Sequence, residues 1–311
     1  MRVVVLAGGS GGVKLAEGFA AMDDVDLTVI PNVADDDDFH GLRVCPDVDS
    51  TLYALSGRLD RSRGWGPADD ATRALGVMGA LGAETWMTLG DADLGLHLWR
   101  TQRLRAGLRP AEVTVEIARR FGIRARVVLP TDDAVRTRVR TDDGWIPFQE
   151  YFVRLRCVPK MRGLAYDGLA EARPTPEALE AVAAADLVVI GPSNPLVSIA
   201  PILGVPGLGA AVAARPVLAV SPLVAGRAIK GPAARMLEAL GQRADAAGVA
   251  AMYAAVADMM VIDEADAGLS PRIEELGLRV RVADTLMPNA PAKERLAREL
   301  AALRVPEAAA S

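Results

Sequence analysis

Residues 3–14 read Val-Val-Val-Leu-Ala-Gly-Gly-Ser-Gly-Gly-Val-Lys, an apolar run of strand length that breaks into four glycines. Leu15 and Phe19 follow with the spacing of one helix face. A strand, a tight turn and a helix start are typical of the first βα unit of an open sheet. Glycines in such a turn let backbone N–H groups approach an anion, and the helix N-terminus adds the positive end of its dipole. The stretch therefore predicts an α/β fold with a phosphate-binding turn.

This turn matches neither of two common phosphate-binding motifs. A Walker A loop ends in Gly-Lys-Ser/Thr, whereas Lys14 stands between Val13 and Leu15. The dinucleotide fingerprint Gly-x-Gly-x-x-Gly also fails, because counting from Gly9 places Lys14 where the last glycine belongs. A glycine turn that binds nothing therefore stays open as an interpretation. Lys14 favours binding, since it is one of only four lysines among 35 basic residues.

The composition indicates a globular protein with a small-molecule partner. The chain has 311 residues, 51% of them hydrophobic, and can bury a substantial core. A net charge of −5 argues against a general nucleic-acid binder. Cys45 and Cys157 have no metal-ligand spacing, so we expect reduced thiols. Because the N-terminus is too short for a signal sequence and no apolar window spans a membrane, we expect a soluble, cytoplasmic protein.

Carboxylates follow the second expected strand, Asp26–Ile30. The run Asp35-Asp-Asp-Asp38 comes soon after its end, and Pro46-Asp-Val-Asp49 adds two more acids before a helical pattern. Open α/β sheets bind ligands beyond the carboxyl ends of their strands, although an acidic run is often only a solvated loop. Hard oxygen ligands beside a phosphate seat suit Mg²⁺, which binds through one or two carboxylates plus substrate phosphates.

Expected strands alternate with expected helices along most of the chain. After Asp26–Ile30 we expect further strands at Glu84–Leu89, Ala184–Ile190, Val217–Ser221, Met259–Asp263 and Leu278–Val282. Several short β-rich runs lie at about residues 127–170, namely Val127–Leu129, Val135–Arg140 and Tyr151–Arg156. The pattern predicts a doubly wound, mostly parallel, Rossmann-like α/β sheet with a small antiparallel β-rich insertion, in a single domain over residues 1–311.

Two acids at the start of one expected helix have alternative interpretations. Asp91 or Asp93 caps the helix that carries His97 and Arg100, or else binds a ligand. His97 has no partner in the sequence, so we expect a packed or helix-surface histidine rather than a catalytic base.

Two further segments carry candidate polar groups. Arg136 and its alternate neighbours put arginines on one strand face, which is either solvated or anion-binding. Ser193 follows an apolar strand but is not in a nucleophile elbow, because Pro195 stands where that motif needs glycine. We expect Ser193 to serve as a hydrogen-bonding group.

Taken together, these segments resemble the 2-phospho-L-lactate transferase family of coenzyme F-420 biosynthesis. They run in order over nearly the full chain: Gly8-Gly-Ser-Gly-Gly-Val-Lys-Leu15, Asp35-Asp-Asp-Asp-Phe39, Pro46-Asp-Val-Asp49, Glu84-Thr-Trp86, Leu89-Gly-Asp-Ala-Asp-Leu94, Phe148-Gln-Glu-Tyr-Phe-Val-Arg154, Gly191-Pro-Ser-Asn-Pro195 and Lys230-Gly-Pro232. The resemblance implies a magnesium-dependent transferase in which a hydroxyl of the deazaflavin Fo attacks a guanosine diphosphate adduct of lactate or enolpyruvate. GMP leaves, and F-420-0 or dehydro-F-420-0 forms.

The resemblance also suggests roles for individual residues. Mg²⁺ is assigned to Asp36, Asp37 and Asp49. Catalytic roles are assigned to Asp49, for orienting the attacking hydroxyl, and to Lys14, for holding the diphosphate with the glycine turn. The family has an arginine where this chain has Ala92, so Arg100 and Arg136 are candidates to replace it. Phosphoryl-type transfer needs positioning and charge neutralisation rather than a covalent nucleophile, which fits the absence of a nucleophile motif. The substrate-binding candidates are Gly8, Gly9, Ser10, Gly11, Gly12, Lys14, Asn32, Asp49, Asp91, Asp93, Arg100, Arg136, Ser193 and Asn194.

Two other functions stay open at this point. A nucleotide-sugar-binding regulatory protein of the gluconeogenesis-factor type shares the glycine turn and a Val-Ala-Asp-Asp-like segment, without catalysis. A nicotinamide oxidoreductase is disfavoured, because four acids stand where one ribose-binding acid is usual. We expect Fo and a guanosine diphosphate adduct as partners, no nucleic acid or membrane, and a homodimer. No residue distinguishes a phospholactyl, phosphoenolpyruvyl or phosphoglyceryl donor.

Overall fold

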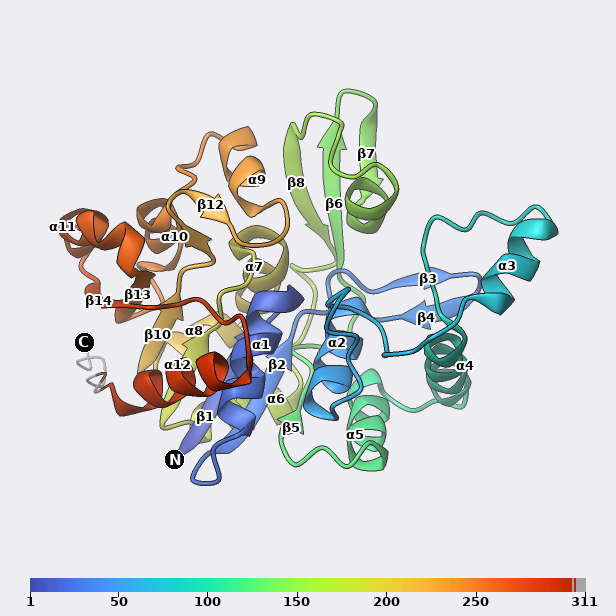
Figure 1. Ribbon diagram of the computed structural model, residues 1–311, viewed down its shortest axis with the longest axis horizontal. Coiled ribbons are helices and arrows are strands. Elements are labelled where there is room, and N and C mark those ends of the chain that lie inside the picture. Colours follow the sequence, from blue (N-terminus) through green and yellow to red (C-terminus); the bar gives the residue numbers. More distant parts are fainter. Residues whose placement is uncertain (304, 306–311) are drawn as a thin grey trace.

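The computed structural model describes residues 1–303 and 305, and its centre is a seven-stranded parallel sheet (Figure 1). Numbered along the chain, the strands lie in the order 7-6-5-4-1-2-3, so the direction of winding reverses between β1 and β9. This order confirms the doubly wound, mostly parallel sheet. In spatial order the strands are β14 (Arg279–Ala283), β13 (Met259–Asp263), β10 (Val217–Val220), β9 (Leu187–Ile190), β1 (Arg2–Ala7), β2 (Asp26–Pro31) and β5 (Arg126–Val127).

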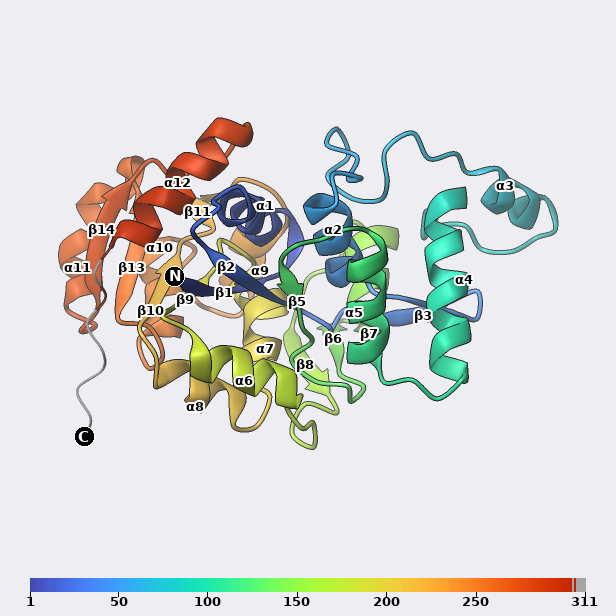
Figure 2. The ribbon, with the colours of Figure 1, turned by 90° about the horizontal axis from the view of Figure 1, so that it is seen from below.

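Helices cover both faces of this sheet. Figure 2 shows α1 and α12 on one side of the strands and α6, α7 and α8 on the other. The helices and helical turns are α1 (Gly9–Ala20), α2 (Pro46–Leu55), α3 (Arg73–Ala80), α4 (Asp91–Arg105), α5 (Pro110–Arg120), η1 (Glu150–Arg154), α6 (Pro176–Ala184), η2 (Pro195–Ile199), α7 (Ala200–Leu203), α8 (Leu208–Ala213), α9 (Ala233–Ala239), α10 (Ala246–Tyr253), η3 (Glu264–Leu269), α11 (Ser270–Glu274) and α12 (Ala290–Ala302). Within the described residues, no helix is long and apolar enough to span a membrane.

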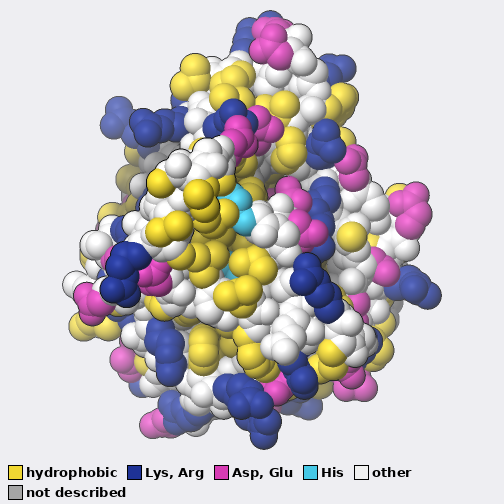
Figure 3. Space-filling model, turned by 90° about the vertical axis from the view of Figure 1, so that its right-hand side faces the viewer, with side chains coloured by type: hydrophobic (Ala, Val, Ile, Leu, Met, Phe, Trp, Pro, Cys, Tyr) yellow, Lys and Arg dark blue, Asp and Glu magenta, His cyan; other side chains and the backbone are white. Residues whose placement is uncertain are grey.

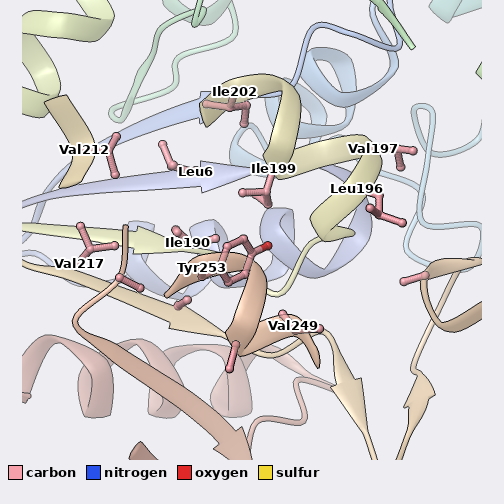
Figure 4. Close-up of a cluster of buried hydrophobic side chains, with 14 of the residues drawn as sticks. Leu6, Ile190, Leu196, Val197, Ile199, Ile202, Val212, Val217, Val249 and Tyr253 are labelled. Carbon is pink, nitrogen blue, oxygen red and sulfur yellow. The ribbon is translucent and has the colours of Figure 1, made fainter. Parts of the chain in front are cut away.

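Alternate side chains of the strands supply two separate cores. Val3 and Val5 of β1 pack with Phe19 of α1 and with α12, whereas Val4 and Leu6 face the opposite layer. Figure 4 shows this second core, where Leu6 and Ile190 of neighbouring strands lie near Ile199 and Tyr253. A fully buried side chain of this size contributes about 1.5–3 kcal/mol, so both faces of the sheet must stay covered. The continuous apolar runs of the central strands follow from this burial.

Three small antiparallel sheets complete the fold. The largest has the order β7-β6-β8, and the others are the hairpins β3-β4 and β11-β12. In β6 the arginines are half-buried or exposed while Thr137 and Val139 are buried, which confirms the expected alternation. The single-domain boundary at residues 1–311 stays a prediction. The bounds are β6 (Arg136–Thr141), β7 (Gly144–Pro147), β8 (Gly163–Asp167), β3 (Asp37–Phe39), β4 (Leu42–Val44), β11 (Leu223–Val224) and β12 (Arg227–Ala228).

Two expected strands are wrong, and a third, Val127–Leu129, belongs not to the antiparallel insertion but to the central sheet, where β5 pairs in parallel with β2. Glu84–Leu89 forms no strand, and Trp86 packs edge-on against Phe39 with ring centroids 5.4 Å apart. The β-rich composition there reflects this aromatic contact rather than a ladder partner. Tyr151–Arg156 is largely the helical turn η1, since Phe152 stacks on Phe148 at 5.5 Å. Local propensity fails in both places because tertiary packing decides the conformation.

The turn between β1 and α1 generates a stability prediction. A Cβ added at Gly11 would lie 2.0 Å from the carbonyl oxygen of Pro192, whereas one added at Gly95 on α4 meets nothing within 4 Å. We expect Gly11→Ala to lower the free energy of unfolding by about 1–3 kcal/mol through overpacking. Gly95→Ala, the matched control, should raise it by about 0.5–1 kcal/mol. Urea denaturation measures both, and an unchanged or more stable Gly11→Ala would contradict the close contact.

Candidate functional site

The glycine turn follows β1, at the point where the direction of winding reverses between β1 and β9. Its first two amides donate hydrogen bonds to side chains of this chain. The Gly8 amide donates to Ser193 Oγ at 3.0 Å, and the Gly9 amide donates to Asp47 Oδ1 at 2.6 Å. Gly9 has a left-handed φ of 60° with open space beside it. The Ser10 and Gly11 amides have no acceptor within the helix, because they belong to its first turn. Two of the donors expected for a phosphate are thus already engaged.

Asp47 connects this turn to the next one along the sheet. Its Oδ2 accepts from Asn32 Nδ2 at 2.9 Å, and Asn32 Oδ1 in turn accepts from the Ala34 amide at 3.0 Å. Burial raises the pKa of Asp47, and the hydrogen bonds from Asn32 and Gly9 oppose that rise. The sequence shows Asp47 but gives it no role. The sequence signal that could have identified Asp47 is its position in the first turn of α2, directly after Pro46.

The expected acidic loop is mostly buried rather than solvated. Asp35 and Asp36 are each 8% exposed, and the Oδ1 atom of each has no hydrogen-bond partner. Burial, with the charge of Asp47 next, raises the pKa of Asp35 well above its ordinary value. Burial raises the pKa of Asp36 to about 7 against the opposing charge of Arg100. A buried carboxylate oxygen without a partner is costly, so this loop is suited to receive a cation.

A pocket of about 210 Å³ opens against this loop. One wall carries carboxylates and the facing wall, formed by β6 and β7, carries guanidinium groups. Arg136 Nε lies 3.7 Å from Asp37 Oδ1 across it. Opposite charges on two walls fit a ligand with an anionic group and a bound cation. The lining residues are Ala34, Asp35, Asp36, Asp37, Arg136, Thr137, Arg138, Pro147, Phe148 and Gln149.

Behind the acidic loop lies a buried network of charged side chains. Arg100 Nη1 donates to Asp49 Oδ2 at 3.1 Å, and Arg100 Nη2 contacts the other oxygen. His97 lies between two acids, with Nδ1 3.7 Å from Asp49 Oδ2 and Nε2 3.3 Å from Asp93 Oδ1. Tyr53 donates to Asp93 at 2.7 Å. His97 is packed, as expected, but it has carboxylate partners that the sequence analysis missed. The i, i+4 spacing of Asp93 and His97 on one helix could have revealed one of them.

The pKa directions agree with this network. Burial lowers the pKa of Arg100, but the charge of Asp49 outweighs it and the net shift is upward. Burial raises the pKa of Asp93, but hydrogen bonds from His97 and Tyr53 outweigh it and the net shift is downward. Arg100 and Asp93 therefore both stay charged inside the protein.

Several candidate residues cap helices in this structure. Asp91 accepts from the Ala74 amide at 3.0 Å in the first turn of α3. The expectation that Asp91 or Asp93 caps α4 is wrong, because Asp70 accepts from the first amides of that helix at 2.8 and 3.1 Å. Asn194 Oδ1 accepts from the Leu196 amide at 2.9 Å and caps η2. Ser193 is a hydrogen-bonding group, as expected, with Gly8 as its donor.

The magnesium ligands expected from sequence do not gather in one place. Throughout residues 1–303 and 305, no three His, Cys, Asp or Glu side chains come together as a metal site. Asp49 uses its oxygens on Arg100, and Asp37 faces Arg136. Asp35 and Asp36 keep an unpartnered oxygen each, so these two have the free donor atoms that Mg²⁺ prefers.

Lys14 lies among a different set of charges. Burial lowers its pKa, and so do Lys293 and Lys230, while Glu17 raises it. Its charged neighbours thus come from α12, from α1 itself and from the loop after β12. Whether Lys14 acts on the same ligand as the acidic loop stays a prediction.

An apolar surface lies on the face shown in Figure 3, where hydrophobic side chains gather around a histidine. Helices α3 and α4 contribute exposed aliphatic side chains to the molecular surface. Val77 is 62% exposed, Leu81 83% and Leu98 57%. In α3 only Leu75 is buried. Such a helix is short of apolar contacts within the chain.

Comparisons with known proteins cover nearly the whole chain. The family model described as 2-phospho-L-lactate transferase CofD matches residues 3–286. A phosphoenolpyruvate transferase of Streptomyces griseus is 39% identical over 308 residues, covering 96% of this chain and 97% of that protein. A 2-phospho-L-lactate transferase of Methanopyrus kandleri is 38% identical over 311 residues, covering 99% and 98%. A UPF0052 protein of Bacillus halodurans shares the fold, with a TM-score of 0.64 at 16% identity over 96% and 98% of the chains.

The link between Asn32 and Asp47 can be tested by exchanging the two residues. Asp47→Asn should place an NH₂ group against Asn32 Nδ2, and Asn32→Asp should place two carboxylates together. We expect each single variant to lose about 1–3 kcal/mol of unfolding free energy. The double variant restores the hydrogen bond between positions 32 and 47 but not the one from Asn32 to Asp35, so it should recover part of that loss. Urea denaturation of all four proteins gives the coupling energy. A double variant as unstable as the sum of the singles would refute the link.

Proposed function

The chain belongs to the 2-phospho-L-lactate transferase CofD family, and from that premise we propose that it makes the phosphodiester of coenzyme F-420. The donor is a guanosine diphosphate adduct of enolpyruvate or lactate, and the acceptor is the hydroxyl of Fo. The hydroxyl oxygen bonds to the phosphorus that carries the organic acid, the bond from that phosphorus to GMP breaks, and the hydroxyl proton is released. The products are dehydro-F-420-0 or F-420-0, and GMP. The comparisons give no support to the regulatory alternative.

The observation that carries this proposal is the pocket with acids on one wall and arginines on the other. A transfer at phosphorus requires that developing oxygen charge be neutralised and that the two substrates be aligned. Arg136 and Arg138 are placed to hold an anionic group of the donor. The pocket therefore supports a transfer without a covalent intermediate on the protein.

We propose Mg²⁺ as the cofactor, held at the acidic loop. The unpartnered Oδ1 atoms of Asp35 and Asp36 fit this ion, which takes few carboxylates and completes its shell with phosphate oxygens. Bound there, the ion would neutralise charge on the diphosphate. Asp37, at the rim of the same pocket, is the third candidate.

Asp49 and Arg100 are assigned to positioning rather than to direct ligation. Asp49 fixes the Arg100 guanidinium, which in turn acts on Asp36. Asp49 therefore fixes the position of the Arg100 guanidinium behind the acidic loop, although the pair as a whole is neutral. The glycine turn, with Ser193 below it and Asp47 beside it, fixes the start of α1 at the strand crossover.

The assay that tests the function offers both donors, since relatives of both names match almost equally well. Purified protein is incubated with Fo, Mg²⁺ and either adduct, and the product is weighed by mass spectrometry. We expect turnover with at least one adduct, lost on chelation of Mg²⁺. Asp36→Asn should lower kcat/KM on the order of 100-fold, as for loss of one charge-stabilising group. Asp38→Asn is the control, because Asp38 lies on the exposed side of β3 and pairs with Arg43. No product from either adduct would rule the function out, and full activity in chelator would rule out magnesium.

We further propose that the chain acts in the cytoplasm as a homodimer. The two buried, free thiols Cys45 and Cys157 suit a reducing compartment. The exposed aliphatic side chains of α3 and α4 supply a surface that a second copy would cover by self-association about a twofold axis.

Light scattering tests the dimer and its interface. We expect a dimer mass for the purified chain. Leu81→Glu should raise the dimer dissociation constant at least about tenfold by placing a charge in the apolar contact. Leu276→Glu is the control, because Leu276 is 39% exposed and follows α11, which lies at the opposite end of the molecule from α3 (Figure 1). A monomer at all concentrations, or equal effects of both variants, would contradict the proposal.

A further inference from the structure

Three of the four lysines of this arginine-rich chain come together around α1. They are Lys14 on that helix, Lys230 in the loop after β12, and Lys293 on α12. Lysines so few in number and so far apart in sequence meet here through the fold alone. Their role is not explained by the acidic pocket described above.

Direct contacts hold these segments around the second turn of α1. Glu17, one turn after Lys14, is paired with Lys293 Nζ and lies 2.8 Å from Arg61 Nη2. Lys230 Nζ donates to the Arg63 carbonyl at 2.8 Å. The loop after α2 and the loop after β12 therefore touch each other, and the first of them also reaches Glu17.

The charges in this cluster do not balance. Lys14, Lys230, Lys293 and Arg61 are four cations, and Glu17 is the one carboxylate paired with any of them within residues 1–303 and 305. Asp60, the nearest acid in the loop after α2, does not offset this surplus, because its carboxylate binds Arg63 and Ser62. Lys14 is half-buried, and burial together with the two other lysines lowers its pKa. An anion entering here would relieve that repulsion.

The cluster is open and lies near the strand crossover. The Arg61 side chain is 60% exposed and Lys230 is exposed. Lys14 follows the glycine turn by less than two turns of α1, and the loop carrying Lys230 comes after the carboxyl end of β10 (Figure 1). In doubly wound sheets a ligand binds in the crevice at this crossover, beyond the strand ends. The surplus charge thus lies on segments that include those after β1 and β10, two strands of the same sheet.

We propose that Lys14, Lys230 and Arg61 form a binding site for a diphosphate group, behind which Lys293 stays buried against Glu17. Resting on the proposed function, the site takes the diphosphate of the guanosine adduct, and Lys230 exchanges the Arg63 carbonyl for a phosphate oxygen. Lysine ammonium groups bind phosphate as point charges.

Inorganic pyrophosphate and GDP are the probes, titrated calorimetrically into the full chain without Fo. Lys14→Ala and Lys230→Ala should each weaken binding of both probes about tenfold, and each should reduce the dependence of affinity on salt. Lys160→Ala is the matched control, since it removes the remaining lysine outside the cluster. It should change the affinity less than about twofold. Thermal midpoints of all variants exclude loss of folding.

Other outcomes separate this site from the transferase proposal. Pyrophosphate binding that depends on Lys14 and Lys230, in a protein that turns over neither adduct, would support the site and overturn the function. Turnover with pyrophosphate affinity unchanged in both variants would support the function and overturn the site. No binding of pyrophosphate or GDP to the unmodified chain would also overturn the site, as would an equal loss in Lys160→Ala.

Discussion

The Asp47 carboxylate is the interaction on which the site depends. This buried carboxylate accepts hydrogen bonds from Gly9 at the start of α1 and from Asn32 just after β2. It therefore joins the turns that follow the neighbouring strands β1 and β2. Because neither oxygen meets bulk water, both donors are required to offset desolvation. The same contact leaves Asp35 beside a second buried carboxylate, which adds to the rise in the pKa of Asp35 that burial causes. The acidic loop is therefore held in an unfavourable electrostatic state that a cation would relieve.

The site is electrically divided although the chain as a whole carries only −5. Carboxylates gather in the loop after β2, while lysines gather around α1. The Rossmann-like winding brings the carboxylates and the lysines to the same edge of the sheet, because the segments that follow β1, β2, β9 and β10 all lie there. A substrate with a diphosphate and a bound cation matches this division. Net charge conceals such a pattern, and only the three-dimensional arrangement reveals it.

The fold was predictable from the sequence because its signals are local. Apolar runs of strand length, the glycine turn and helical spacing all lie within a few residues, and the central strands were found with errors of one to a few residues. The site was predictable only as a list of residues. The Gly8–Ser193 bond joins residues 185 positions apart, and Lys230 reaches Arg63 across 167 positions. Spacing in the sequence carries no information on such contacts, so Asp47, the partners of His97 and the lysine cluster had to come from the structure.

The substitution at Ala92 shows how burial decides between two candidates. Ala92 is exposed in the first turn of α4, at the position where the resemblance to the family implies an arginine. Arg100 lies on the same helix but is 3% exposed, with its guanidinium engaged by Asp49. Withdrawing it would leave a buried carboxylate unpaired at a cost of about 3–5 kcal/mol. Arg136 can leave its partner at a lower cost, because its contact with Asp37 is longer and half-exposed. Arg136 also lines the pocket. Arg136 is therefore the better placed of the two to supply the missing positive charge.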